Sequence, residues 1–212
     1  MEGLLRRTTT QNVVLTLDAC GGPYGSAYDA ELIDFLRAER IPAVLFLNKR
    51  WIEANPAQVD RFAAEQDLFD IGNHGTRHAP LSVTGRSQFK EPGTRDAGEV
   101  YDEVVTNHEF LTRLLGKPPR YFRTGTAYYD EVALDIVKAC GEIPVGFDIN
   151  GDAGTTYDAA TTAKETSLAK AGSIIIGHFN QPKRETYEGM KVALPRLRSR
   201  GLVFARLSDC GV

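Results

Sequence analysis

Short apolar runs alternate with longer amphipathic segments along the chain. Most of the apolar runs are rich in Val, Ile, Leu or Phe, which is typical of strands buried on both faces of a parallel sheet. The runs that predict strands are residues 13–18, 43–48, 68–73, 120–124, 144–149, 173–179 and 202–207.

The segments between these runs have the spacing of amphipathic helices. They predict helices at residues 26–41, 55–66, 96–116, 129–141, 160–171 and 183–199. Ser26 is the expected N-cap of the first helix, and Asn55 is the expected N-cap of the second, with Pro56 in its first turn. Gly116 and Gly141 are expected to end two others.

Seven strands separated by six helices predict an α/β fold with parallel strands and right-handed crossovers. Two arrangements satisfy this pattern: a closed barrel, whose chemistry lies at the carboxyl ends of its strands, and an open doubly wound sheet. The longest irregular stretch, residues 79–95, is expected to cover a site or to be mobile.

Length and composition favour one soluble domain spanning residues 1–212. The net charge is −3 and no basic run is present, so we expect no nucleic-acid partner. No apolar stretch reaches the roughly 20 residues that span a bilayer. The first ten residues lack the apolar region of a signal peptide, so we expect a cytoplasmic protein, or an extracytoplasmic one if a signal peptide has been trimmed. Three cysteines are no disulfide framework, although one pair could form.

Polar residues of the kinds that act in catalysis or metal binding follow several predicted strands. If the strands are parallel, these residues lie on one rim: Asp18, His74, His78, Arg123, Asp148, Asp152 and His178. His74 and His78 are four residues apart, which in a helical turn would place both rings on one face, able to bind one metal ion. The segment lacks the glutamate of the H-E-x-x-H metalloproteases, and two unrelated loop histidines are the alternative.

Five segments resemble, in order, the motifs of a known family. LTLDAC, NHGTRH, FRTGT, FDINGD and IIIGH are similar to T-F-D-D, H-S/T-x-x-H, R-x-P-Y, D-x-x-D-W and L-x-H of the polysaccharide deacetylases, the NodB-homology domain of carbohydrate esterase family four. The resemblance covers roughly residues 12 to 207. It implies a distorted (β/α) barrel of about seven parallel strands.

The resemblance also implies roles for individual residues. Asp18 would be the general base, Arg123 would orient it by an ion pair, and His178 would be the general acid. His74 and His78 would bind a divalent metal, usually zinc, with cobalt or nickel as alternatives.

Three further roles concern loops. Asp152 matches the aspartate that orients the acid, with Asp148 as second choice. Backbone N–H groups near Gly125 or Thr126 would stabilise the oxyanion, with Tyr128 beside the substrate.

One departure affects the metal site. The second aspartate of the first motif is a metal ligand in the family, and here this position is Ala19. Asp18 could move to the metal, Cys20 could supply a thiolate, or two histidines and water could hold the ion.

The third and fourth motifs are also altered, and the tryptophan of the fourth is absent. Four aromatic residues could instead form the floor of a sugar site: Tyr24, Tyr128, Tyr129 and Phe179.

We therefore expect a metal-dependent hydrolase that removes N-acetyl groups from a polysaccharide of the chitin or peptidoglycan type. An O-acetyl esterase or a cyclic-imide hydrolase of the same fold is one alternative. A non-catalytic carbohydrate-binding barrel is another, because of Ala19.

Overall fold

A single parallel sheet organises the chain in the computed structural model, which describes residues 2–212. Its strand order is β5-β4-β3-β2-β1-β7-β6, with every neighbouring pair parallel. The strands are β1 (Val14–Ala19), β2 (Ala43–Leu47), β3 (Phe69–Asn73), β4 (Tyr121–Phe122), β5 (Ile143–Pro144), β6 (Ile149–Asn150) and β7 (Ile174–His178).

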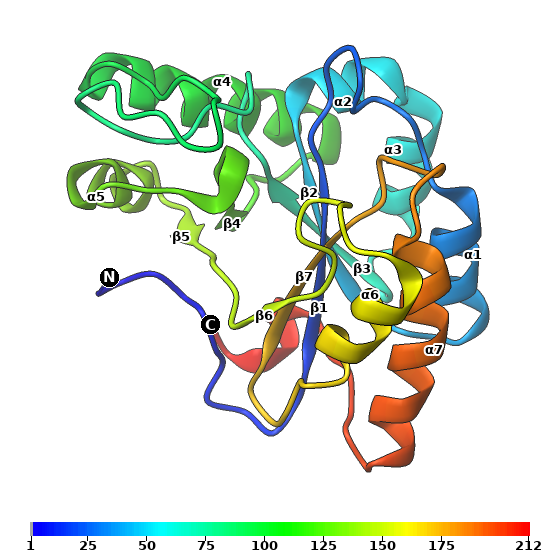
Figure 1. The fold of residues 1–212 in the computed structure, drawn as a ribbon. Coiled ribbons are helices and arrows are strands. Elements are labelled where there is room, and N and C mark those ends of the chain that lie inside the picture. The colour runs from blue at the N-terminus through cyan, green and yellow to red at the C-terminus, as the bar shows by residue number, and fades with distance from the viewer. Residues whose placement is uncertain (1) are drawn as a thin grey trace.

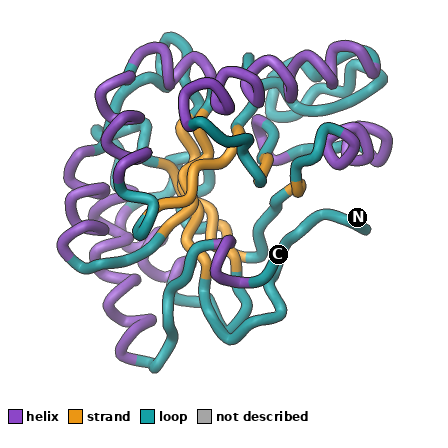
Figure 2. Tube along the Cα trace, turned by 180° about the vertical axis from the view of Figure 1, so that it is seen from behind, coloured by secondary structure: helices purple, strands orange, loops and turns teal. Residues whose placement is uncertain are grey.

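The sheet curls into an arc with helices along its outer side, as Figures 1 and 2 show. Two-residue strands form both edges, and the N-terminal segment lies across the gap between them through bridges from Leu5 to Val145 and from Arg7 to Ser173. This is the expected distorted barrel, with β2 in the middle of the strand order and β1 beside it.

Each of the six predicted helices is present. The α-helices are α1 (Ala30–Ala38), α2 (Lys49–Ala54), α3 (Pro56–Ala64), α4 (Ala97–Leu115), α5 (Glu131–Ala139), α6 (Ala159–Thr166) and α7 (Thr186–Ser199). Two 3-10 helices, η1 (Gly125–Ala127) and η2 (Leu207–Cys210), complete the regular structure of residues 2–212.

Two helix predictions need correction. Ser26 does not cap α1; the Asp29 side chain does, by accepting the N–H of Leu32. Helix α2 was not predicted, because six residues are too few for the period of a helix to emerge in the sequence.

Two strand predictions were also wrong in detail. Residues 144–149 do not form one strand, because the chain turns away between β5 and β6, where Asp148 is bound by Arg7. Residues 202–207 form no strand of the sheet: they make one bridge, from Val13 to Phe204, and then enter η2. Their alternating apolar side chains are buried against two different clusters without a ladder of hydrogen bonds.

The alternation of β1 sets the position of the polar residues. Leu15, Leu17 and Ala19 belong to the main apolar cluster beneath the outer helices, whereas Thr16 and Asp18 contact Arg123 on the inner face. Because successive side chains of a strand point to opposite faces, the strand can end on a carboxylate without disturbing the outer core. In the described part of the chain, no helix is both long and apolar enough to cross a membrane.

Candidate functional site

Asp18 and Arg123 form a buried ion pair at the carboxyl ends of β1 and β4. Arg123 Nη1 lies 2.9 Å from Asp18 Oδ1 and also donates to Thr16 Oγ1 at 2.6 Å. Arg123 Nη2 donates to the carbonyl oxygen of Gly146 at 2.8 Å, and the guanidinium lies 4.4 Å from the ring centroid of Phe46. The charge of Asp18 is therefore balanced, and its second oxygen accepts no hydrogen bond from the residues that the structure describes.

The second oxygen of Asp18, Oδ2, faces His74, the residue after β3. His74 Nε2 lies 3.7 Å from Asp18 Oδ2 and 3.8 Å from Cys20 Sγ. His74 Nδ1 lies 2.8 Å from the carbonyl oxygen of Arg123, which can only accept, so Nδ1 carries the proton. This backbone bond leaves the lone pair of Nε2 available, as it does in histidines that bind metals.

His78 reaches the same place through a bend rather than a helical turn. Residues 74–78 contain no helix, and Gly75 (φ 74°) and His78 (φ 66°) adopt left-handed backbone conformations. The rings of His74 and His78 nevertheless meet edge to face, with centroids 4.9 Å apart. The two rings thus lie together as predicted, but a bend brings them together and not a helical turn.

Cys20 completes a group of three metal-ligand side chains. Donor atoms of Cys20, His74 and His78 all lie within 4.8 Å of one another. Burial raises the pKa of the Cys20 thiol, but His78 first and then the other imidazoles outweigh burial and hold this pKa well below its usual range. A thiolate and two imidazoles are a ligand set that suits zinc. Ala19, by contrast, is fully buried in the apolar cluster.

His178, the last residue of β7, is held by Asp152. His178 Nδ1 donates to Asp152 Oδ1 at 2.9 Å, and Thr186 Oγ1 donates to Asp152 Oδ2 at 3.0 Å. Burial alone would lower the pKa of His178, but the Asp152 carboxylate raises this pKa well above the usual value. His178 is paired in register with Asp18, so both residues lie on the same rim.

Asp148, the second choice for orienting His178, lies at the other end of the sheet. Its carboxylate accepts the N–H of Ile174, the first residue of β7, and binds Arg7 and Ser173. Asp148 therefore cannot orient His178, which follows four residues later on β7.

The predicted oxyanion loop packs against the histidine bend. A Cβ atom at Gly125 would collide with the carbonyl oxygen of His78, so only glycine fits there. Thr126 (φ 59°) follows in a left-handed conformation, and its buried Oγ1 has no hydrogen-bond partner within residues 2–212. The ring of Tyr128 lies 5.9 Å from the guanidinium of Arg86, in the long loop 79–95.

Two of the four aromatic residues proposed for a sugar site are unsuitable. Tyr129 is 2% exposed and its hydroxyl donates to the carbonyl oxygen of Phe122, while Phe179 is fully buried against Trp51. Tyr24, in contrast, is 90% exposed on the loop that follows Cys20.

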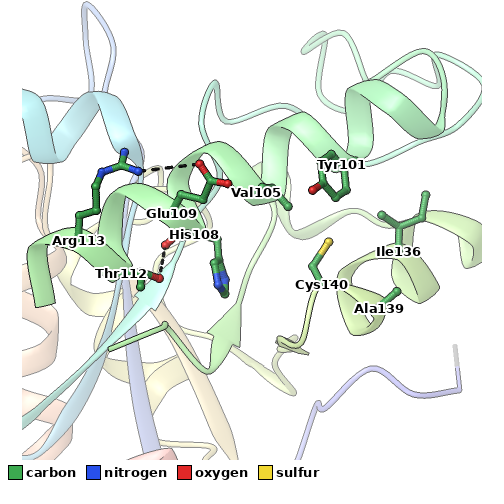
Figure 3. A pocket seen from close by; sticks show the side chains of 9 residues that line it. All are labelled: Tyr101, Val105, His108, Glu109, Thr112, Arg113, Ile136, Ala139 and Cys140. Atoms are coloured by element: carbon green, nitrogen blue, oxygen red, sulfur yellow. Dashed lines mark hydrogen bonds and ion pairs between the residues drawn. The ribbon is translucent and has the colours of Figure 1, made fainter. Parts of the chain in front are cut away.

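His108 lies apart from this cluster, on α4. It lines a groove of about 600 Å³ between α4 and α5, which Figure 3 shows together with Tyr101 and Cys140. His108 Nδ1 donates to the buried Glu142 at 2.8 Å. Cys20, Cys140 and Cys210 are all free thiols in the described structure.

Sequence reasoning missed three residues that position this cluster: Thr16, Glu103 and Thr186. Glu103 had a visible signal, since it lies beside Val104 and three residues after Val100 on the face of α4 that is buried. The hydroxyls of Thr16 and Thr186 had none, because threonine is common in buried strands and at helix starts.

Comparisons with known proteins agree with the fold. A chitin deacetylase of Pestalotiopsis sp. is 26% identical over 210 residues, which cover 96% of this chain and 64% of that protein. A peptidoglycan N-acetylglucosamine deacetylase superposes with a TM-score of 0.80 at 21% identity, covering 98% of this chain and 92% of the other. A pseudoenzyme of carbohydrate esterase family four from Bacillus anthracis gives 0.77 at 15% identity, covering 97% and 67%.

Residues 6–143 match the sequence model of the polysaccharide deacetylases. The match includes the segments of Asp18, His74, His78 and Arg123, whereas His178 and Asp152 lie beyond it. Because it spans more than half of the residues, the chain belongs to the polysaccharide deacetylase family.

Proposed function

We propose that this protein is a metal-dependent hydrolase that removes N-acetyl groups from a polysaccharide of the chitin or peptidoglycan type. The observation that carries the proposal is the meeting of an oriented carboxylate, a group of three metal-ligand side chains and a carboxylate-bound imidazole on one rim. The similarity to a chitin deacetylase and to a peptidoglycan deacetylase supports this choice of substrate class.

Cys20, His74 and His78 would hold the metal, for which we propose zinc because thiolate and imidazole together suit it. When bound, zinc lowers the pKa of a coordinated water and polarises the carbonyl of the substrate. The bond from His74 Nδ1 to the Arg123 carbonyl fixes the ring in the tautomer that such binding needs.

Asp18 serves as the general base in this proposal. Arg123 fixes its carboxylate, and Oδ2, which faces the ligand group, receives a proton from the attacking water. The ion pair with Arg123 keeps the Asp18 carboxylate in one orientation.

His178 serves as the general acid. Its Nδ1 proton is held by Asp152, so Nε2 is the atom that can give a proton to the amine as the C–N bond breaks. An amine leaves poorly unless it is protonated, and the Asp152 carboxylate favours the protonated ring.

The loop after β4 completes the proposed site. Backbone N–H groups of Gly125 and Thr126 are our candidates for binding the oxyanion, because this loop packs directly against His78. Tyr128 and the exposed Tyr24 are candidates for contact with the sugar.

The proposal is tested by measuring acetate released from N-acetylglucosamine oligomers, from peptidoglycan and from acetylated xylan, each with one equivalent of zinc. We expect turnover of at least one N-acetylated glycan. Turnover of the O-acetylated xylan alone would replace the proposal with an esterase. No acetate from any of them would refute hydrolysis of acetylated polysaccharides.

A second candidate function is a non-catalytic carbohydrate-binding protein. Ala19 in place of the metal aspartate favours it, and so does the similar fold of a pseudoenzyme. This candidate predicts glycan binding that survives His74→Ala together with negligible bound metal. Stoichiometric zinc that is lost in His74→Ala would exclude it.

A further inference from the structure

Glu103, on α4, is a buried carboxylate that contacts none of the proposed reacting groups. It is 1% exposed, and its oxygens accept backbone N–H groups from Thr76 at 3.0 Å, Arg77 at 2.9 Å and Ala79 at 3.2 Å. A buried carboxylate needs such donors, since leaving it unpaired is costly. Glu103 meets that need with three amides from one short segment.

These three amides belong to the bend that carries His78. Thr76 and Arg77 precede this histidine, and Ala79 follows it. In a helical turn these N–H groups would point along the helix axis, whereas here they converge on a side chain from another element. In a helical turn, backbone carbonyl groups would accept these N–H groups. Here the Glu103 carboxylate accepts them instead.

The backbone of the bend depends on this contact. His78 has φ 66°, a left-handed conformation that costs a residue other than glycine free energy and persists only when its surroundings enforce it. A Cβ atom at Gly75 would lie 2.5 Å from Glu103 Oε1, so the carboxylate approaches as closely as a glycine permits.

Other contacts hold the His74 side of the bend without Glu103. The Asn48 side chain donates to the carbonyl oxygens of His74 and Gly75, each at 2.9 Å, and Asn73 Oδ1 accepts the N–H of Gly75 at 2.9 Å. Asn107, one turn beyond Glu103 on α4, donates to Asn73 Oδ1 at 2.8 Å. The His78 side has Glu103 as its main anchor.

We propose that Glu103 is a positioning residue that fixes His78 relative to His74 and Cys20, and so sets the affinity of this group for a divalent metal. The proposal rests on the metal site described under the proposed function. Glutamine at this position keeps the size of the side chain. In the wild type Oε1 accepts all three amides and Oε2 accepts the N–H of Arg77 as well. Glutamine keeps one acceptor oxygen, removes the negative charge and places an NH₂ group against the N–H of Arg77, so it holds the bend less firmly.

The test compares zinc binding by the wild type, Glu103→Gln and the control Glu109→Gln. Glu109 is on the same helix but is exposed, and within residues 2–212 its ion-pair partner is Arg113. Zinc affinity is measured by competition with a chromophoric chelator, alongside the melting temperature of the metal-free proteins. We expect Glu103→Gln to bind zinc about 10- to 100-fold more weakly, as for other residues that orient metal ligands. The control is expected to match the wild type.

A purely structural role would lower the melting temperature of Glu103→Gln but leave the affinity of its folded fraction unchanged, and that result would overturn the proposal. The absorption spectrum of bound cobalt is a second readout, expected to change in Glu103→Gln because the ligand geometry changes. If Glu103→Gln does not fold, Glu103→Asp is measured instead. It keeps the charge on a shorter side chain, and wild-type zinc affinity in this variant would equally overturn the proposal.

The same experiment separates this inference from the proposed function. Absence of zinc binding by the wild type and the control would refute the metal site, and the role of Glu103 with it. Zinc binding by the wild type with unchanged affinity in Glu103→Gln would refute only the role of Glu103.

Discussion

At the scale of single residues, β1 has Ala19 where the family motif has its second aspartate, and Cys20 follows directly. Asp18 and Cys20 are two residues apart and lie on the same side, while Ala19 between them faces the apolar cluster. Of the three ways to compensate for Ala19, the geometry favours the thiolate, because Cys20 Sγ lies with the nitrogens of His74 and His78. Asp18 is already bound to Arg123.

The role of Cys20 leads to the first prediction. Cys20→Ser should weaken zinc binding, since a hydroxyl remains protonated and is a poorer ligand than a thiolate. In the cobalt-loaded wild type we expect a thiolate-to-cobalt charge-transfer band in the near ultraviolet, and in the variant we expect this band to vanish. A band of equal intensity in both proteins would show that Cys20 is not a ligand.

Asp18 is tested by Asp18→Asn. We expect the rate of acetate release to fall by about 10²- to 10⁴-fold, the usual contribution of a general base. Stability should also fall, because Arg123 loses its buried counter-charge.

Asp148→Asn is the matched control for Asp18→Asn, because Asp148 pairs with Arg7 at the opposite end of the sheet. It should leave the rate of acetate release unchanged. If Asp18→Asn keeps the wild-type rate, the base is another group.

At the scale of elements, α4 supports both the histidine bend and the contact with α5. Glu103 and Asn107 bind the segment from Asn73 to Ala79, and His108 reaches Glu142 after α5. The limits predicted for this helix, Asp96 and Gly116, are confirmed, and these two residues are its caps. The function of its buried polar residues was not predicted, because a sequence does not show which backbone groups a carboxylate will meet.

The pair of His108 and Glu142 predicts how stability depends on pH. The hydrogen bond to Glu142 raises the pKa of His108 above 6.5 in the folded state. The resulting stabilisation is therefore complete below the unfolded pKa of about 6.5 and is lost as pH rises through the higher folded value. Burial raises the pKa of Glu142 as well, which gives the same sign.

The measurement is the melting temperature of the metal-free protein between pH 6 and 9, for the wild type and His108→Gln. As pH rises across this range, the melting temperature of the wild type should fall by more than that of His108→Gln. Parallel curves would show that the pair does not contribute.

At the scale of the whole molecule, the sheet forms an incomplete barrel, because its edge strands β5 and β6 do not pair with each other. Residues 4–8 span the gap: Leu5 N donates to the Pro144 carbonyl at 2.9 Å, and Thr8 N donates to the Gly172 carbonyl at 2.9 Å. The sequence indicated seven strands and a rim of polar residues at their carboxyl ends. It did not show that three of the strands would have two residues each, because strands this short leave no periodic pattern.

The N-terminal segment can be tested by deletion. Removing residues 1–8 should lower the free energy of unfolding by more than Arg7→Ala, because the deletion also removes the backbone hydrogen bonds across the gap. Arg7→Ala breaks a partly exposed ion pair, which contributes at most about 1 kcal/mol. Urea denaturation measures both changes, and equal effects would show that the backbone bridge adds no stability.

Titration of the metal-free protein with zinc, followed by acetate release from N-acetylglucosamine oligomers, tests the central claim most directly. We predict that the rate rises with added zinc and levels off at one equivalent per chain, and that His74→Ala shows no such rise. A rate that is independent of zinc, or a rise that His74→Ala retains, would contradict the account.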